Sequence, residues 1–156
     1  MKPTAKSVLV VDDDKMVLAL CKLAFDQHGY RVLVAENGNA ALRYLEVGTV
    51  DVVLLDILMP EKDGLETLLE IRKRFPQITV LSMCETGPRS KYDFLSVAKK
   101  FGASAVLQKP IRPAEVIQII DALPFDRAPK ADFSETRAFS AIGSGMYSYR
   151  KSVHRG

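Results

Sequence analysis

Two stretches of sequence, Val8-Leu9-Val10-Val11 and Val52-Val53-Leu54-Leu55, are apolar at every position and rich in β-branched side chains. A strand with one face in water alternates apolar and polar residues, whereas a strand covered on both faces is apolar throughout. The two stretches therefore predict central strands of a parallel sheet that is covered by helices. With three further apolar runs they predict five strands, over residues 7–11, 31–35, 51–55, 79–81 and 105–107.

Apolar residues at helical spacing separate these strands. In the first such segment Val17, Leu20, Cys21, Ala24 and Phe25 recur at intervals that place them on one side of a helix, and we expect them to be its buried face. The same spacing, bounded by glycine or proline, predicts four more helices, over about 39–47, 65–75, 94–101 and 113–123. The alternation predicts a doubly wound α/β fold, a five-stranded parallel sheet flanked by five helices.

Length and charge divide the chain into two parts. Its 156 residues are 47% apolar and 26% charged, which is typical of one globular domain. Residues 1–123 carry 16 basic and 16 acidic side chains, whereas residues 124–156 carry six basic and three acidic ones and account for the net charge of +3. We expect a domain over 1–123 and a basic, flexible tail over 124–156, in which aromatic residues are isolated. The basic excess therefore does not make the domain a nucleic-acid binder.

Membrane, secreted and metal-thiolate classes are disfavoured. No apolar run approaches the ~20 residues needed to cross a bilayer. The only two cysteines, Cys21 and Cys84, lack CxxC spacing; we expect the first in the core and the second in a loop. Such cysteine usage is typical of a cytoplasmic protein.

Polar residues follow four of the expected strands. Asp12-Asp13-Asp14 follows the first strand, Asp56 the third and Ser82 the fourth, and Lys109 lies just beyond the fifth. Ligands of such sheets bind at the carboxyl ends of the strands, so we expect these side chains to converge. Clustered carboxylates suit Mg²⁺, and a lysine beside them suits phosphate. The sequence predicts phosphoryl transfer with an aspartate nucleophile, because no cysteine or histidine follows a strand directly.

The segment 9–14, the pattern D-x-x-M-P-x-x-D-G over 56–64, Ser82 and the pair Lys109-Pro110 resemble the receiver domain of two-component response regulators. The resemblance covers about residues 7–123, and the combination of these features is highly specific. It implies the flavodoxin-like receiver fold and a signalling phosphoacceptor rather than an enzyme. It also implies a sensor histidine kinase or a histidine phosphotransfer protein as the phosphoryl donor.

The resemblance also assigns roles around a magnesium ion. Asp56 is implied as the phosphoacceptor and as a metal ligand. Asp13 would bind Mg²⁺ directly, Asp12 mainly through water, and the backbone carbonyl of Leu58 would complete the protein's ligands. Asp14 is as well placed to cap the helix that follows it as to join this group.

Further roles follow from the same resemblance. Ser82 would move toward the phosphoryl group on activation, and Lys109 would pair with that group. Pro110 suggests a cis Lys-Pro bond, while Pro60 and Gly64 would shape the loop after the acceptor.

Two departures from the family pattern concern activation. Val106 occupies the place of the usual Tyr or Phe, so the aromatic switch coupled to Ser82 is missing and backbone shifts must relay the signal. Met83 replaces the usual small residue, and the segment over 83–90 lengthens the connection to the next helix. We expect that segment to overhang the site and to restrict the access of water or partners.

The expected output is a protein contact or a phosphorelay. The 33 residues after Leu123 are too few for a helix-turn-helix domain, so we expect a stand-alone receiver, monomeric or weakly dimeric. A downstream target would bind about residues 92–123, and nucleic acid is not expected as a partner. An aspartate phosphohydrolase is disfavoured, because Leu58 stands where its second carboxylate is needed. The alternative is a phosphorylation-independent binding module whose basic tail contacts nucleic acid or protein.

Overall fold

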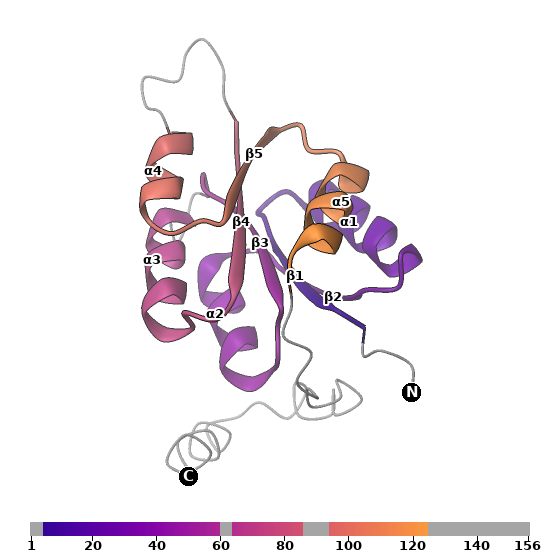
Figure 1. Ribbon diagram of the computed structural model, residues 1–156, viewed down its shortest axis with the longest axis horizontal. Coiled ribbons are helices and arrows are strands. Elements are labelled where there is room, and N and C mark those ends of the chain that lie inside the picture. Colours follow the sequence, from indigo (N-terminus) through magenta and orange to yellow (C-terminus); the bar gives the residue numbers. More distant parts are fainter. Residues whose placement is uncertain (1–4, 60–63, 86–93, 125–156) are drawn as a thin grey trace.

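The computed structural model describes residues 5–59, 64–85 and 94–124, in which strands and helices alternate (Figure 1). The strands are β1 (Ser7–Val11), β2 (Arg31–Ala35), β3 (Val52–Asp56), β4 (Thr79–Glu85) and β5 (Ala105–Lys109). The helices are α1 (Lys15–Gln27), α2 (Gly38–Val47), α3 (Gly64–Arg74), α4 (Phe94–Lys100) and α5 (Pro113–Ala122). These elements confirm the predicted α/β fold. Within the described ranges, no helix has the length and apolar composition needed to cross a membrane.

A single parallel sheet contains the five strands in the order β2-β1-β3-β4-β5. Helices α1 and α5 cover one face, and α2, α3 and α4 cover the other (Figure 1). The chain begins near the middle of the sheet, adds β2 on one side, and then crosses to add β3, β4 and β5 on the other. The strand order therefore reverses at β1 and β3, the place where sheets of this kind bind ligands.

The central strands are buried on both faces, as their apolar sequences predict. Val8 and Val10 pack toward Phe25 on the side of α1 and α5, whereas Leu9 packs toward Leu68 on the side of α2 and α3. Every residue of β1 and β3 is buried. The hydrophobic effect from both layers therefore fixes the two strands whose carboxyl ends carry the acidic residues.

Helix α1 corrects one prediction about the buried face. Leu18, Cys21 and Phe25 are buried, but Leu20, which we expect inside, is 53% exposed. The helix carries apolar residues on two sides, because Met16, Leu20 and Leu23 form a second set at helical spacing. With two such sets, spacing alone does not tell which one faces the sheet.

Strand β4 is longer than predicted and contradicts the placement of Cys84 in a loop. It continues past Ser82 to Glu85, because Met83 and Cys84 pair in register with Leu107 and Gln108 of β5. The segment expected to overhang the site is therefore strand over 83–85, and the rest of it lies outside the described residues. Strand β5 likewise extends to Lys109, and β3 begins and ends one residue later than expected.

Hydrogen bonds stabilise the amino-terminal edge of the sheet. The buried carboxylate of Asp51 accepts hydrogen bonds from the Ser7 backbone N–H at 2.8 Å and from the Ser7 hydroxyl at 3.1 Å, which joins β1 to the start of β3. The Lys6 ammonium donates to the Ile120 carbonyl at 3.1 Å, which joins β1 to the end of α5. This edge is therefore held by hydrogen bonds between elements distant in the sequence.

We predict that Asp51→Ala lowers the free energy of unfolding by about 1–3 kcal/mol, because it leaves the buried backbone N–H of Ser7 without its acceptor. Urea denaturation measures the change. The matched control is Asp26→Ala, which removes an exposed carboxylate paired with Lys22 at 2.9 Å and should cost less than about 1 kcal/mol. Equal losses in the two variants would contradict the structural role of Asp51.

Candidate functional site

Three strand ends and one position within β4 bring the predicted site residues together. Asp12 directly follows β1, Asp56 is the last residue of β3, and Lys109 is the last residue of β5. Ser82 lies in β4, in register with Leu55 of β3. Because β1, β3, β4 and β5 are consecutive neighbours in the sheet, their carboxyl ends meet at one edge.

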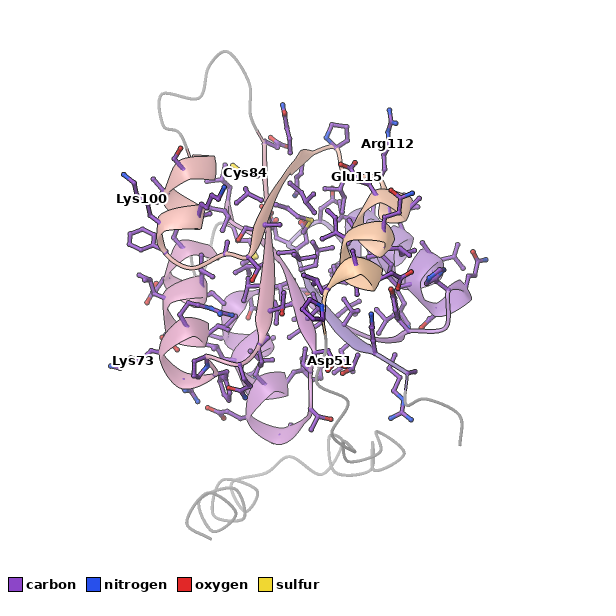
Figure 2. The ribbon with its side chains drawn as sticks, in the orientation of Figure 1. Asp51, Lys73, Cys84, Lys100, Arg112 and Glu115 are labelled. Carbon is purple, nitrogen blue, oxygen red and sulfur yellow. The ribbon has the colours of Figure 1, made fainter. Side chains whose placement is uncertain are left out.

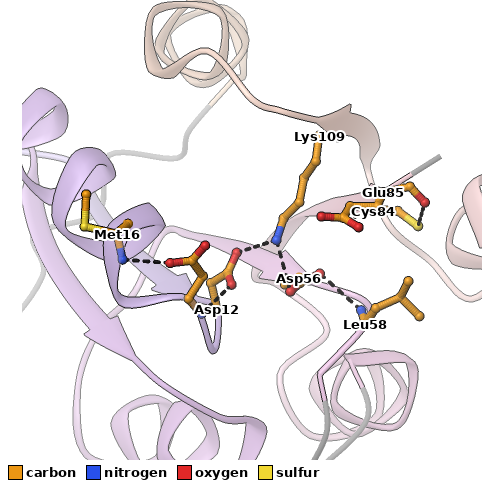
Figure 3. A network of polar contacts seen from close by, with 8 residues as sticks. Asp12, Met16, Asp56, Leu58, Cys84, Glu85 and Lys109 are labelled. Carbon is orange, nitrogen blue, oxygen red and sulfur yellow. Dashed lines mark hydrogen bonds and ion pairs between the residues drawn. The ribbon is translucent and has the colours of Figure 1, made fainter. Parts of the chain in front are cut away.

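Lys109 bridges the two buried carboxylates (Figure 3). Its ammonium lies 2.7 Å from Asp12 Oδ2 and 3.1 Å from Asp56 Oδ2. Asp12 is fully buried and Asp56 is 2% exposed. A charge-assisted pair in such surroundings is poorly screened by water, so the ammonium compensates a large part of the repulsion between the two carboxylates.

Backbone N–H groups hold the other oxygen of each carboxylate. Asp12 Oδ1 accepts from the Asp14 N–H at 2.9 Å, and Asp56 Oδ1 accepts from the Leu58 N–H at 3.1 Å. These donors were missed in the sequence analysis, although an aspartate that accepts from the N–H two residues later is a common turn. Asp14 makes the same contact with the Met16 N–H at 2.8 Å and caps α1, which favours its capping role.

Three carboxylates lie close enough to share a cation. One oxygen from each of Asp12, Asp13 and Asp56 falls within 4.8 Å of the others, and Asp13 is exposed while the other two are buried. Such an all-oxygen donor set fits Mg²⁺. With Lys109 as a single positive charge, the group retains two formal negative charges, which a divalent cation would balance. That the backbone carbonyl of Leu58 is a further ligand of the metal stays a prediction.

Burial and charge shift the proton equilibria of this site. Burial and the Asp12 charge raise the pKa of Asp56 from 3.8 to about 6, while Lys109 and the Leu58 N–H act in the opposite direction. Burial lowers the pKa of Lys109, but its hydrogen bond to Asp12 and the charges of Asp56 and Asp12 outweigh that effect and raise it. At neutral pH the site therefore contains an ionised Asp56 beside a firmly protonated lysine.

The two cysteines do not compete as nucleophiles. Both are buried, and burial raises the pKa of the Cys21 thiol to about 11. Burial also raises the pKa of Cys84, and the negative charges of Asp56 and Glu85 add to the effect. Because the thiolate is the reactive form, these protonated thiols are poor nucleophiles.

Ser82 is positioned beside the acceptor strand without a hydrogen-bond partner. Its hydroxyl is buried, and among the described residues it meets no donor or acceptor. Val106 stands opposite Ser82 in the register of β4 and β5. A buried hydroxyl without a partner is energetically unfavourable, which is consistent with a group that gains a partner in another state of the site.

Gly64 permits the tight connection that follows Asp56. A Cβ at this position would lie 2.1 Å from the Asp56 carbonyl oxygen and 2.4 Å from the Ile57 Cα. The Gly64 N–H donates to the Ile57 carbonyl at 3.1 Å, which fixes α3 against the end of β3. The Lys109-Pro110 peptide bond is cis, as the resemblance implies. Gly64 and Pro110 thus lie in the connections that follow β3 and β5, next to the carboxylates and Lys109.

The fold and the site define a class of protein: a doubly wound α/β domain with a carboxylate cluster and a lysine at the carboxyl edge of its sheet. The family model of the response regulator receiver domain matches residues 8–121. The chain therefore belongs to the response regulator receiver family, whose members act in two-component signal transduction.

Curated relatives are longer than this chain. The transcriptional regulatory protein CpxR of Klebsiella pneumoniae subsp. pneumoniae (strain HS11286) is 37% identical over 137 residues, which are 88% of this chain and 55% of CpxR. The alkaline phosphatase synthesis transcriptional regulatory protein PhoP of Bacillus subtilis (strain 168) is 29% identical over 118 residues, 76% of this chain and 48% of PhoP. The chain thus spans about half the length of these relatives.

Solved structures share the fold over most of their length. A CheY-like response regulator receiver domain protein from Methanospirillum hungatei JF-1 superposes with a TM-score of 0.69 at 27% identity, over 76% of this chain and 92% of that one. The receiver domain of the Francisella response regulator 1452 gives a TM-score of 0.67 at 28% identity, over 74% and 93%. These matches confirm the flavodoxin-like receiver fold.

We predict that Gly64→Ala destabilises the protein by about 3 kcal/mol, because its Cβ would overlap backbone atoms that have little room to move. Thermal or urea denaturation measures the effect. Gly29→Ala is the matched control: Gly29 has a φ of +90° but open space around it, so only backbone strain of about 1–2 kcal/mol is expected. A smaller loss for Gly64→Ala than for Gly29→Ala would contradict the close approach at Asp56.

We predict that Asp56→Asn raises the free energy of unfolding in magnesium-free buffer at pH 7 by about 1–3 kcal/mol. Because the pKa of Asp56 is raised to about 6 in the folded state, burying its charge costs stability above that pH. The cost disappears as the pH falls from 6 toward 4 and the carboxylate is protonated in the folded protein. Urea denaturation at several pH values measures the difference, and a gain that grows as the pH falls would contradict this explanation.

Proposed function

We propose that Asp56 accepts a phosphoryl group from a histidine kinase or a histidine phosphotransfer protein. The observation that carries the proposal is the placement of its carboxylate, with Oδ2 on Lys109 and Oδ1 on the Leu58 N–H, beside Asp12 and Asp13. An Asp56 oxygen attacks phosphorus, the bond between phosphorus and the donor's imidazole nitrogen breaks, and that nitrogen retains the electron pair. The product is an aspartyl phosphate.

Charge decides whether this attack is feasible, because an anionic nucleophile approaches an anionic phosphoryl group. Lys109 lies within 3.1 Å of Asp56 and supplies one positive charge at the point of attack. Asp12 and Asp13, with Asp56 and in our proposal the Leu58 carbonyl, would hold Mg²⁺, which supplies further neutralisation of the phosphoryl oxygens when bound. The oxygen donor set and its excess negative charge support this choice of metal.

Ser82 and Val106 define how we propose that the phosphoryl group is sensed. The Ser82 hydroxyl, buried and without a partner among the described residues, gains a hydrogen bond to a phosphoryl oxygen. The neighbouring position in β5 is Val106, whose side chain has no hydroxyl and no ring to reorient. The movement of Ser82 is therefore relayed by the backbone of β4 and β5 rather than by an aromatic side chain.

The output that we propose is a protein contact. Residues 1–123 would form the phosphorylated domain and 124–156 a basic segment attached to it, with a target bound on α4, β5 and α5 up to Leu123. The relatives CpxR and PhoP are named transcriptional regulatory proteins, and about half of each lies outside the match. Transcriptional regulation is thus a property of those proteins, whereas the proposal here concerns the phosphorylation of this domain.

The deciding experiment is phosphoryl uptake from acetyl phosphate with and without Mg²⁺. We expect magnesium-dependent labelling of the wild type and loss of labelling in Asp56→Asn, because the amide has no nucleophilic oxygen anion. Asp14→Asn is the matched control: asparagine caps a helix as well as aspartate does, so α1 should persist and labelling should be retained.

Two outcomes would overturn the proposal. Absence of labelling in the wild type would leave a binding module that works without phosphorylation. Equal labelling of wild type and Asp56→Asn would show that another residue is the acceptor. Loss of labelling in Asp14→Asn with an unchanged circular dichroism spectrum would show instead that Asp14 belongs to the reacting group.

A further inference from the structure

The outer side of α3 and α4 combines lysines with exposed apolar side chains. Lys73 ends α3 and Lys99 and Lys100 end α4; all three are exposed, and none pairs with a carboxylate among the described residues. Lys73 and Lys100 both point away from the sheet on the same side of the molecule (Figure 2). Leu69 in α3 and Phe101 after α4 are 45% and 41% exposed. These five residues define the α3–α4 surface.

The ends of the two helices are packed against each other. A Cβ at Gly102, which follows Phe101, would lie 2.7 Å from the Arg72 Cδ, so the stem of this arginine fills the space beside the turn after α4. The Arg72 guanidinium also donates to the carbonyl of Ile78 at the start of β4. The chain segments that carry Lys73 and Phe101 are therefore neighbours, held together by the residue that precedes Lys73.

Charge is distributed unequally between the two helical layers. Helices α2, α3 and α4 carry six basic and three acidic residues, whereas α1 and α5 carry two basic and three acidic ones. In the first layer Arg74 pairs with Glu46 and Glu70, so its charge is compensated locally. The exposed lysines of the α3–α4 surface have no such compensation, and they give this layer its positive potential.

The helix dipole accounts for only part of this charge. The carboxyl-terminal end of a helix carries about half a negative charge, which basic residues commonly balance. Besides the paired Arg74, α3 ends in Arg72 and Lys73, and α4 ends in Lys99 and Lys100. Two positive charges at each helix end exceed what the dipole balances. The surface therefore remains attractive to an anionic partner.

The chemistry of the surface narrows the choice of partner. The segment 125–156 carries six basic and three acidic residues, so like charge disfavours it. Nucleic-acid binding depends on contacts with many phosphates, and three unpaired lysines supply few of them. The aliphatic Leu69 offers no face on which a base could stack. Lysines beside Leu69 and Phe101 instead suit a protein segment that has both carboxylates and apolar side chains.

We propose that the α3–α4 surface binds an acidic segment of a partner protein. Its carboxylates meet the three lysines, and its apolar side chains pack on Leu69 and Phe101. The helix ends adjoin the starts of β4 and β5, whereas Asp56 lies at the opposite edge of the sheet, so the phosphoacceptor stays open to a protein donor. The surface shares α4 with the target region proposed above but extends onto α3, and its binding does not require phosphorylation.

The test is fluorescence anisotropy on the full chain with a fluorescein-labelled peptide of glutamates interrupted by one phenylalanine and one leucine. We expect saturable binding that Lys73→Gln/Lys100→Gln weakens about five- to tenfold, because two exposed charge pairs are lost. Phe101→Ser should weaken it to a similar extent. The matched control, Lys15→Gln/Lys22→Gln, removes the same charge from α1 and should leave the affinity within about twofold.

A second peptide tests the apolar part of the contact. With serines in place of its phenylalanine and leucine, the peptide keeps its charge and should bind at least about threefold more weakly, because Leu69 and Phe101 lose their partners. Equal binding of the two peptides would overturn the proposal, since it would leave a charge effect alone.

Four other outcomes would also overturn it. The peptide fails to bind the wild type. The two double lysine variants weaken binding equally, which shows a response to net charge only. An oligothymidylate of the same charge binds more tightly and depends on Lys73 and Lys100, which identifies a nucleic acid as the occupant. The wild type dimerises in sedimentation while Lys73→Gln/Lys100→Gln does not, which identifies a second copy. A failure of acetyl phosphate labelling bears on Asp56 alone.

Discussion

The bridge from Lys109 to Asp12 and Asp56 is the interaction on which the site depends. Its three groups come from the ends of β5, β1 and β3, at positions 12, 56 and 109. Only a sheet that places these ends at one edge allows a single ammonium to reach both carboxylates. The strand order, the cis peptide bond after Lys109 and the close approach of Gly64 to Asp56 all lie around this bridge.

Burying this charged bridge costs free energy, and the packing of the rest of the domain offsets that cost. Two carboxylates almost without solvent contact repel each other, and burial raises the pKa of Asp56 to about 6. Side chains fill the space on both faces of the sheet (Figure 2). The apolar strands β1 and β3, buried throughout, hold the two carboxylates in place despite this repulsion. The site thereby retains an excess of negative charge, which a divalent cation would balance.

The sequence predicts most of this arrangement because the signals are local. Continuous apolar runs identify β1 and β3, and a carboxylate directly after each run identifies Asp12 and Asp56. A prediction from a local pattern is wrong where two different arrangements of the chain are consistent with that pattern. Helix α1 has two apolar stripes, so Leu20 is wrongly assigned to the core, and β4 extends to Glu85 because its pairing with β5 is not visible in β4 itself. The strand order and the bridge depend on contacts between distant residues, which no local pattern contains.

The two edges of the sheet differ in a way that fits a switch. At the amino-terminal edge, Asp51, Ser7 and Lys6 make hydrogen bonds between elements that are far apart in the sequence. At the carboxyl edge, like charges oppose one another and the hydroxyl of Ser82 meets no partner among the described residues. The unfavourable interactions of the described residues therefore gather at the edge where, in our proposal, phosphorylation changes the charge. Under that proposal, neutralising the cluster would alter this edge first, while the hydrogen bonds of the opposite edge would preserve the fold.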